Sequence, residues 1–184
     1  MSSSGFYDAG LLRQVATNLF YGWGYNFYRV ENQLRADDQL VRSKASNLLG
    51  IAMASLSEAE AGYRRQFLPS PTRAKPFPDK AAIAAAQQLE QLAKEVGSLE
   101  ALIQQQPVPE NDRVTQRYRL EAPTLKALIH YDEQLVGQCD LLRSMVVGKD
   151  GSAILAKLPD LVGGVEAIRG TLQSRESLLL DRAL

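Results

Sequence analysis

The sequence of 184 residues predicts an all-α protein, an antiparallel bundle of four to five helices, several of them long. Apolar residues recur at intervals of three and four over long stretches, which is the spacing of one face of an amphipathic helix. No segment shows the alternation of apolar and polar residues that is typical of a half-buried strand. Prolines and glycines separate the helical stretches, so consecutive helices can fold back on one another. We expect residues 1–184 to form a single domain.

The longest predicted helical segment covers residues of about 7–67. Its apolar residues keep one helical phase, which is strong evidence for a helix. They are Leu12, Ala16, Leu19, Trp23, Phe27, Val30, Leu34, Val41, Ala45, Leu48, Ala52, Leu56, Ala59 and Tyr63. An unbroken helix of this length would extend roughly 87 Å, which exceeds the size of a compact bundle formed by this chain. We therefore expect a break near residues 22–24, where two glycines lie, or around Gly50.

A linker and a second helix follow. Residues 69–78 contain four prolines and cannot be helical. Asp79 is expected to cap a helix over residues 79–106, because its side chain can accept a hydrogen bond from a free backbone N–H of the first turn. The apolar residues of this helix are spaced as in a helical bundle: Ala85, Leu89, Leu92, Val96, Leu99 and Ile103.

Two more helical segments complete the predicted bundle, over residues 123–147 and 152–183. The glycines at 148 and 151 indicate a turn between these two helical segments. The first segment presents Leu125, Leu128, Asp132, Leu135, Cys139, Leu142 and Val146 on one side. The second presents Ile154, Leu158, Leu161, Val165, Ile168, Leu172 and Leu179.

Composition excludes several classes of function. Basic and acidic residues balance at 21 each, so the chain has no basic excess for binding phosphate backbones, and we expect no nucleic-acid partner. No apolar run is long enough to cross a bilayer, and the first residues lack the pattern of a secretory signal. The single cysteine, Cys139, cannot form an intrachain disulfide and is expected to be buried. We expect a cytoplasmic protein without integral membrane association.

The least ordinary feature is a group of six aromatic residues within residues 20–28. On a helix, Phe20, Trp23 and Phe27 fall on the side of the apolar stripe. The tyrosines at 21, 25 and 28 fall on another side, which continues to Arg35. We interpret Tyr21, Tyr25, Tyr28 and Arg35 as a partner-binding surface, because tyrosine and arginine are enriched in such surfaces. The alternatives are that another part of the same chain covers the tyrosines, or that they line a cofactor or lipid site.

The sequence offers little for catalysis. A di-iron bundle needs Glu-x-x-His motifs on two helices, whereas this chain has one histidine, His130, and no such motif. His130 and Cys139 point to opposite sides of their predicted helix, so they cannot form a nucleophile–base pair. No phosphate-binding or dinucleotide fingerprint is present. We expect no metal and no cofactor.

Several charged residues nevertheless share a phase with apolar ones: Glu31, Asp38, Arg42, Asp132, Arg143 and Arg175. Buried charges must be paired, so the favoured interpretation is a polar layer between helices that fixes their register. We expect Asp132 to bind an arginine or a hydroxyl of another helix. The functional alternative is a ligand or metal pocket, since paired carboxylates can do acid–base chemistry. Asp38 and Arg42 could also form an ordinary surface ion pair.

These observations favour a non-catalytic helical protein-interaction module, such as an adaptor, a chaperone-like factor or an assembly subunit. It would bind a partner protein or a second copy of itself through its aromatic N-terminal helix. The alternative is an enzyme or small-ligand-binding bundle that uses the carboxylates and arginines between its helices. A third possibility is peripheral membrane association through the aromatic segment, but that segment lacks the lysine-rich polar face that membrane surfaces favour.

The helical phase predicts that Trp23 is buried with Phe27, Val30 and Leu34. Trp23→Ala should then reduce the free energy of unfolding by about 3–5 kcal/mol, because a large cavity is left behind. Denaturant unfolding of the wild type and the variant measures this loss. Tryptophan emission like that of indole in water, together with unchanged stability of the variant, would contradict the prediction.

Overall fold

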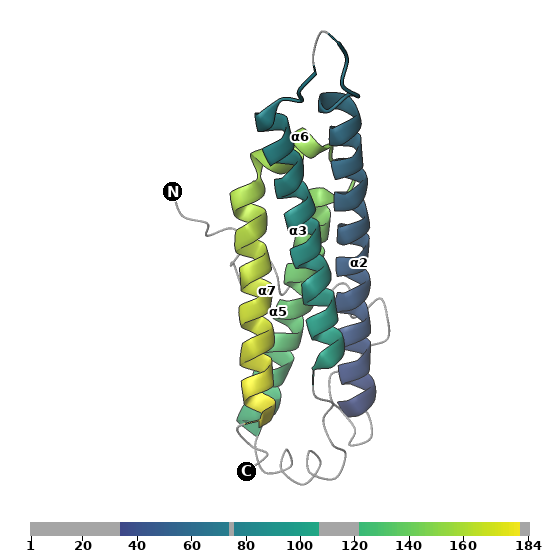
Figure 1. The fold of residues 1–184 in the computed structure, drawn as a ribbon. Coiled ribbons are helices and arrows are strands. Elements are labelled where there is room, and N and C mark those ends of the chain that lie inside the picture. The colour runs from purple at the N-terminus through teal and green to yellow at the C-terminus, as the bar shows by residue number, and fades with distance from the viewer. Residues whose placement is uncertain (1–33, 74–75, 107–121, 181–184) are drawn as a thin grey trace.

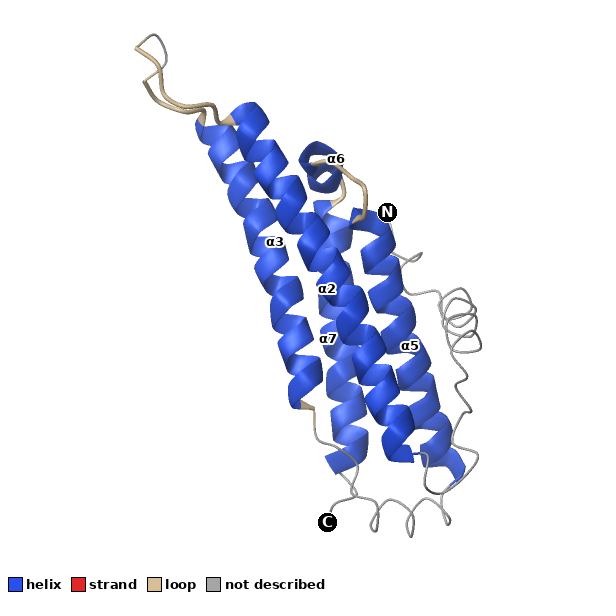
Figure 2. Ribbon diagram, turned by 90° about the vertical axis from the view of Figure 1, so that its right-hand side faces the viewer, coloured by secondary structure: helices blue, strands red, loops and turns tan. Residues whose placement is uncertain are grey.

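The computed structural model describes residues 34–73, 76–106 and 122–180, and all regular structure in these ranges is helical. The helices are α2 (Leu34–Phe67), α3 (Lys80–Gln105), α5 (Ala122–Val146), α6 (Gly151–Ala156) and α7 (Leu158–Leu180). Figures 1 and 2 show the four long helices side by side as a bundle. The predicted all-α bundle is confirmed. Residues 1–33, which include the possible break at 22–24, lie outside the described ranges, and the single domain over 1–184 stays a prediction.

Consecutive long helices run in opposite directions. α2 and α3 form a hairpin whose connection contains the predicted proline-rich linker, and residues 68–73 and 76–79 of that connection are not helical. α5 packs beside α2, α7 packs beside α5, and α3 and α7 make the sparsest of the contacts between neighbouring long helices. Around the bundle the order is therefore α2, α3, α7, α5. The short helix α6 contacts α2 and α3 near the end where these two helices are connected (Figure 1).

The core is built from the apolar stripes that the sequence predicts. α2 buries Val41, Ala45, Leu48, Leu49, Ala52, Leu56 and Ala59, and α3 buries Ala82, Ala86, Leu89, Leu92, Val96, Leu99 and Ile103. Only Ala85 of the predicted α3 stripe is half-buried, because Ala82 and Ala86 face the core instead. The alanines allow the two helix backbones to approach closely, which suits the extensive α2–α3 contact.

α5 buries a wider face than the single stripe that the sequence predicts. Besides Leu128, Asp132, Leu135, Cys139, Leu142 and Val146 of the predicted stripe, α5 buries Glu133, Val136 and Gln138. The reason is the position of α5, which packs against α2 on one side and α7 on the other. Gln138 is paired there, since it accepts a hydrogen bond from Thr171 of α7 at 2.9 Å. A helix with two neighbours needs two adjoining buried stripes, and a stripe of one phase describes only one of them.

The helix boundaries follow from local chemistry, with two differences from the prediction. α2 passes through Gly50 without a break, because the packed leucines and alanines around it outweigh a glycine cost of about 1 kcal/mol. The segment predicted over 152–183 is divided, because the backbone N–H of Lys157 closes α6 and a new helix begins at Leu158. Pro159 follows in the first turn of α7, where a residue without an N–H leaves no hydrogen bond unmade.

Two aspartates cap helices as their positions suggest. Asp79 accepts a hydrogen bond from the N–H of Ala81 at 3.0 Å, which confirms the predicted start of α3. Asp150 accepts one from the N–H of Ala153 at 2.8 Å and starts α6. Gly148 has a φ of +68°, a left-handed conformation that glycine adopts without steric cost, so it makes the tight turn after α5.

Apolar side chains are concentrated between the helices, and the exposed large ones are scattered over several elements. They are Ile51, Phe67, Phe77, Leu102, Val147 and Val162. None of the helices in the described part of the chain combines the length and the apolar character that crossing a bilayer requires. The described helices therefore bury their apolar faces against one another.

Gly151 marks the tightest approach at the α6 end of the bundle. A Cβ atom there would lie 2.9 Å from Cβ of Tyr63, 3.0 Å from Cδ1 of Leu89 and 3.1 Å from the carbonyl oxygen of Ala59. A backbone oxygen cannot move aside as a flexible side chain can. We expect Gly151→Ala to reduce the free energy of unfolding by about 1–3 kcal/mol, the usual cost of overpacking.

Gly170 provides the matched control, because a Cβ atom there would meet no atom within 4 Å. Gly170→Ala should raise stability by about 0.5–1 kcal/mol, since alanine loses less backbone entropy in a helix. Thermal and urea unfolding, followed by circular dichroism, measure both variants. Equal effects at the two positions would show that α6 does not pack closely on α2 and α3.

Candidate functional site

A buried arginine joins three helices of the bundle. Arg175 of α7, whose side chain is 1% exposed, donates from Nε to Oδ1 of Asp132 on α5 at 2.7 Å. Its Nη2 donates to Oδ1 of Asp38 on α2. Both carboxylates are also 1% exposed. One planar guanidinium thus bridges two carboxylates from different helices, as only arginine can. The prediction that Asp132 pairs with an arginine or a hydroxyl of another helix is confirmed.

Arg42 extends these contacts to the fourth long helix. Its Nη2 lies 3.0 Å from Oδ2 of Asp38, one turn away on α2. Its Nη1 donates to the backbone oxygen of Gln106, the residue that ends α3, at 3.0 Å. A cation is favourable at this position, because the last carbonyl groups of a helix carry partial negative charge. We refer to Asp38, Arg42, Gln106, Asp132 and Arg175 as the ion-pair cluster.

The guanidinium of Arg175 stays protonated inside the bundle. Burial alone would lower the pKa of its guanidinium, but the negative charges of Asp132 and Asp38 and their hydrogen bonds outweigh this effect, so the pKa is raised above its ordinary value. Pairing of this kind offsets the cost of removing the ions from water without adding much net stability. We therefore expect its main contribution to be specificity, because another register of α2, α5 and α7 would leave a buried charge without its partner.

The remaining residues of the predicted polar layer lie elsewhere. Arg143 is 32% exposed and its Nη2 lies 2.8 Å from Oδ1 of Asp140 on the same helix. It lies about 16 Å along α5 from Asp132, so it does not belong to the cluster. Glu31 lies outside the described residues. Asp38 and Arg42 do form an ion pair, but Asp38 is buried, so the interpretation of this pair as an ordinary surface contact is wrong.

The predicted partner-binding residues are not placed by the structure. Tyr21, Tyr25 and Tyr28 lie outside the described residues. Arg35 is part of α2, but its side chain lies outside the described part. Trp23, expected to be buried, is also outside it.

Sequence reasoning missed the uncharged members of the polar interior. Neither the contact of Gln106 with Arg42 nor the pair between Gln138 and Thr171 was predicted. A signal exists for Thr171, because it lies four residues before Arg175 and therefore on the same side of α7. Uncharged polar residues are common on both exposed and buried faces, so phase alone does not single them out.

The structure does not favour Cys139 and His130 as a nucleophile and its base. His130 is exposed and Cys139 is buried, as their helical phases predict. Burial, assisted by the negative charge of Asp140, raises the pKa of the Cys139 thiol well above its usual range, so the thiolate is not formed at neutral pH. Within the described ranges, no three histidine, cysteine, aspartate or glutamate side chains gather closely enough to hold a metal ion.

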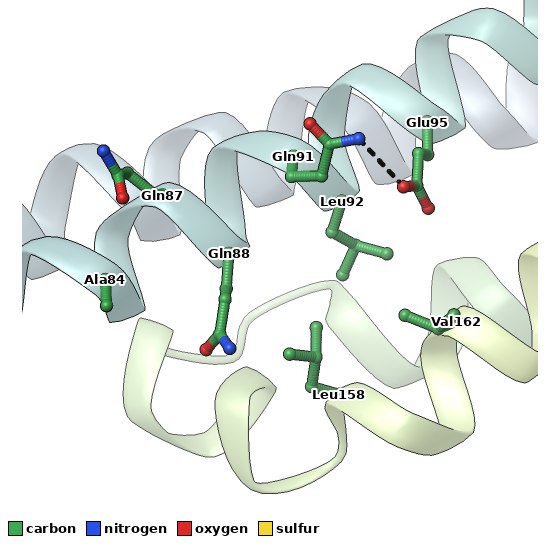
Figure 3. Close-up of a pocket in the computed structure, with 8 residues that line it drawn as sticks. All are labelled: Ala84, Gln87, Gln88, Gln91, Leu92, Glu95, Leu158 and Val162. Atoms are coloured by element: carbon green, nitrogen blue, oxygen red, sulfur yellow. Dashed lines mark hydrogen bonds between the residues drawn. The ribbon is translucent and has the colours of Figure 1, made fainter. Parts of the chain in front are cut away.

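Two open grooves lie away from the cluster. The larger, of about 440 Å³, lies between α3 and the beginning of α7, where Leu92 and Leu158 point toward each other (Figure 3). Gln87, Gln88, Gln91 and Glu95 of α3 form its polar wall, and Gln91 donates a hydrogen bond to Glu95. The second, of about 390 Å³, lies between the end of α2 and the turn around Gly148. Neither groove is lined by a residue of the ion-pair cluster.

Comparisons with known proteins give no match to this chain, whether with models of protein families, with curated proteins or with solved structures. The candidate site is therefore defined by its own geometry. That geometry is a set of paired charges from α2, α5 and α7 inside the bundle, which Arg42 links to the end of α3 through the backbone oxygen of Gln106.

The pairing of Asp132 leads to a stability prediction. Asp132→Ala removes one of the two carboxylates that hold the buried guanidinium of Arg175, and we expect the free energy of unfolding to fall by about 3–5 kcal/mol. Asp140→Ala is the matched control on the same helix, because it breaks a partly exposed pair worth about 0–1 kcal/mol. Urea unfolding followed by circular dichroism compares the two. A loss for Asp132→Ala as small as for the control would mean that the cluster is hydrated rather than buried.

Proposed function

We propose that this chain is a non-catalytic protein-interaction module, such as an adaptor, a chaperone-like factor or an assembly subunit. It binds a partner protein or a second copy of itself through Tyr21, Tyr25 and Tyr28, with Arg35 further along the same helical side. The proposal includes a cytoplasmic location, in keeping with a single cysteine that forms no disulfide.

The observation that carries the proposal is the pattern of burial along α2. Its buried residues from Val41 to Ala59 have the helical phase that Trp23 and Phe27 share in the sequence. The helical side that carries Tyr21, Tyr25 and Tyr28 in the sequence continues to Gln39 of α2. The side chain of Gln39 is exposed. A helix that keeps this phase directs its tryptophan toward the core and its tyrosines away from it, which is the arrangement that an interaction surface needs.

The same side of α2 changes character further along the bundle. Ser46 lies on it, yet Ser46 is buried and accepts a hydrogen bond from Nε2 of Gln104 on α3 at 2.8 Å. α3 therefore covers this side from about Ser46 onward. We infer that a partner would bind the part of this side that precedes Ser46, to which the three tyrosines belong by sequence.

The chemistry of these residues suits protein recognition. Tyrosine offers a large apolar ring with few rotatable bonds, so ordering it on binding costs little side-chain entropy. Its hydroxyl group and the guanidinium of Arg35 supply hydrogen bonds that set orientation. Tyrosine and arginine are among the residues that most often dominate the binding energy of interfaces.

The alternative of an enzyme or a small-ligand-binding bundle has less support. The carboxylates that it would use, Asp38 and Asp132, are 1% exposed and are already bound to Arg175. A general acid or base must reach a proton of its substrate, and these groups face another side chain instead.

The triple variant Tyr21→Ala/Tyr25→Ala/Tyr28→Ala tests the proposal. We expect it to keep the helicity and the unfolding midpoint of the wild type while losing self-association, or losing the partner that the wild type retains from the native host. Light scattering after size-exclusion chromatography measures the first property, and affinity purification with mass spectrometry measures the second.

Trp23→Ala serves as the control, because it lies on the core side of the same segment and should lose stability instead. A triple variant that melts far below the wild type and no longer unfolds cooperatively would show that the tyrosines are internal packing. A triple variant with unchanged stability, oligomeric state and partners would also contradict the proposal.

A further inference from the structure

The connection between α2 and α3 presents the most exposed large apolar side chain of the described part of the chain. Phe77 is 86% exposed, whereas the other exposed large apolar side chains there are between 38% and 41% exposed. Its neighbours Pro76 and Pro78 are exposed as well. A single exposed apolar side chain is common on protein surfaces, so its meaning depends on its surroundings.

The first feature of these surroundings is that they project from the bundle. α6 packs on α3 at Leu89, whose Cδ1 would lie 3.0 Å from a Cβ atom at Gly151. α3 begins nine residues earlier, at Lys80, so it extends roughly 13 Å beyond that contact. Figures 1 and 2 show the hairpin of α2 and α3 projecting past α6. We refer to residues 64–73 and 76–80 as the hairpin tip. A flat surface can approach the hairpin tip without first meeting α6.

The second feature is a positive charge that the whole chain does not have. The hairpin tip contains four basic residues and one acidic residue, whereas the chain contains 21 of each kind. Arg64 is paired with carboxylates of α2 and α3. Arg65, Arg73 and Lys80 are exposed and form no ion pair within the described ranges. The acidic residue, Asp79, is occupied as the cap of α3.

An exposed aromatic ring among basic side chains matches the surface of a bilayer that contains anionic lipids. Aromatic rings are favourable at the level of the lipid headgroups. A basic residue close to an anionic surface strengthens binding about fivefold. The four prolines of the hairpin tip have no backbone N–H, so fewer donors lose water when the connection enters the headgroup region.

A protein partner with an aromatic-lined groove fits less well. Such grooves bind proline-rich chains as an extended polyproline helix. Here the chain bends at Phe77, between its two prolines. A bend directs one side chain outward, which suits shallow entry into a flat surface better than an extended lie along a groove.

We propose that the hairpin tip binds the surface of bilayers that contain anionic lipids, with the ring of Phe77 among the headgroups and Arg65, Arg73 and Lys80 beside the lipid anions. The contact is peripheral, because an irregular connection cannot enter the hydrocarbon without leaving its backbone groups unpaired. The tyrosines of the proposed function belong to a different part of the sequence. Either proposal can therefore fail without the other.

Co-sedimentation of the full chain with lipid vesicles tests the proposal. We expect binding to vesicles of phosphatidylcholine and phosphatidylserine in equal parts, weakening as salt is added, and little binding to phosphatidylcholine alone. Phe77→Ser should reduce the affinity for the mixed vesicles about tenfold, because apolar surface is no longer removed from water. Arg73→Gln should reduce it about fivefold. The controls are Leu102→Ser and Arg169→Gln, which change partly exposed side chains away from the hairpin tip and should leave binding unchanged.

The outcomes separate the proposal from its alternatives. Phe77 and Arg73 are exposed, so both variants should keep the unfolding midpoint of the wild type, which circular dichroism checks. Absence of binding to the mixed vesicles would overturn the proposal. Unchanged binding in both variants would overturn it by assigning the contact to another surface, and equal losses in the controls would do the same. Binding to a recombinant domain with an aromatic-lined groove, lost in Phe77→Ser and without vesicle binding, would assign a protein partner instead.

Discussion

The contact on which the bundle most depends is the bridge from Arg175 to Asp38 and Asp132. Apolar stripes bring helices together but tolerate sliding by a turn, since leucine and alanine pack against many partners. A buried guanidinium between two carboxylates tolerates no such shift, because sliding would expose three charges to an apolar environment. The three charged residues lie 137 and 43 positions apart along the chain in their two pairings. They therefore fix helices that local sequence could not align.

The two ends of the bundle differ in how the helices meet. At the α6 end, Gly151 packs closely against Tyr63, Leu89 and the backbone of Ala59. At the other end, the ion-pair cluster adds charges and hydrogen-bonding groups to the core. Close packing favours rigidity, whereas paired buried charges favour a defined register.

This division bears on function. The charged groups that looked most like catalytic candidates are paired with one another inside the bundle. The proposed interaction surface instead consists of Tyr21, Tyr25 and Tyr28, which precede α2 in the sequence, and of Arg35 at the start of α2. A firmly registered bundle offers such a surface a rigid support, and rigid presentation lowers the entropy cost of binding a partner.

The sequence by itself determined the helices and most of the core, because a helix has a fixed period and its buried face must be apolar. The stripes of α2 and α3, the cap at Asp79, the burial of Cys139 and the exposure of His130 all follow from that period. The sequence also indicated that Asp132 needs a partner, since a carboxylate in an apolar stripe is costly. Only the tertiary structure decided which partner, because Arg42 and Arg175 are both arginines of other helices near apolar faces, and the packing of α7 against α5 brings Arg175 to Asp132. It also decided that Gly50 continues a helix and that Gln106 joins the cluster, since both depend on contacts between residues far apart in the chain.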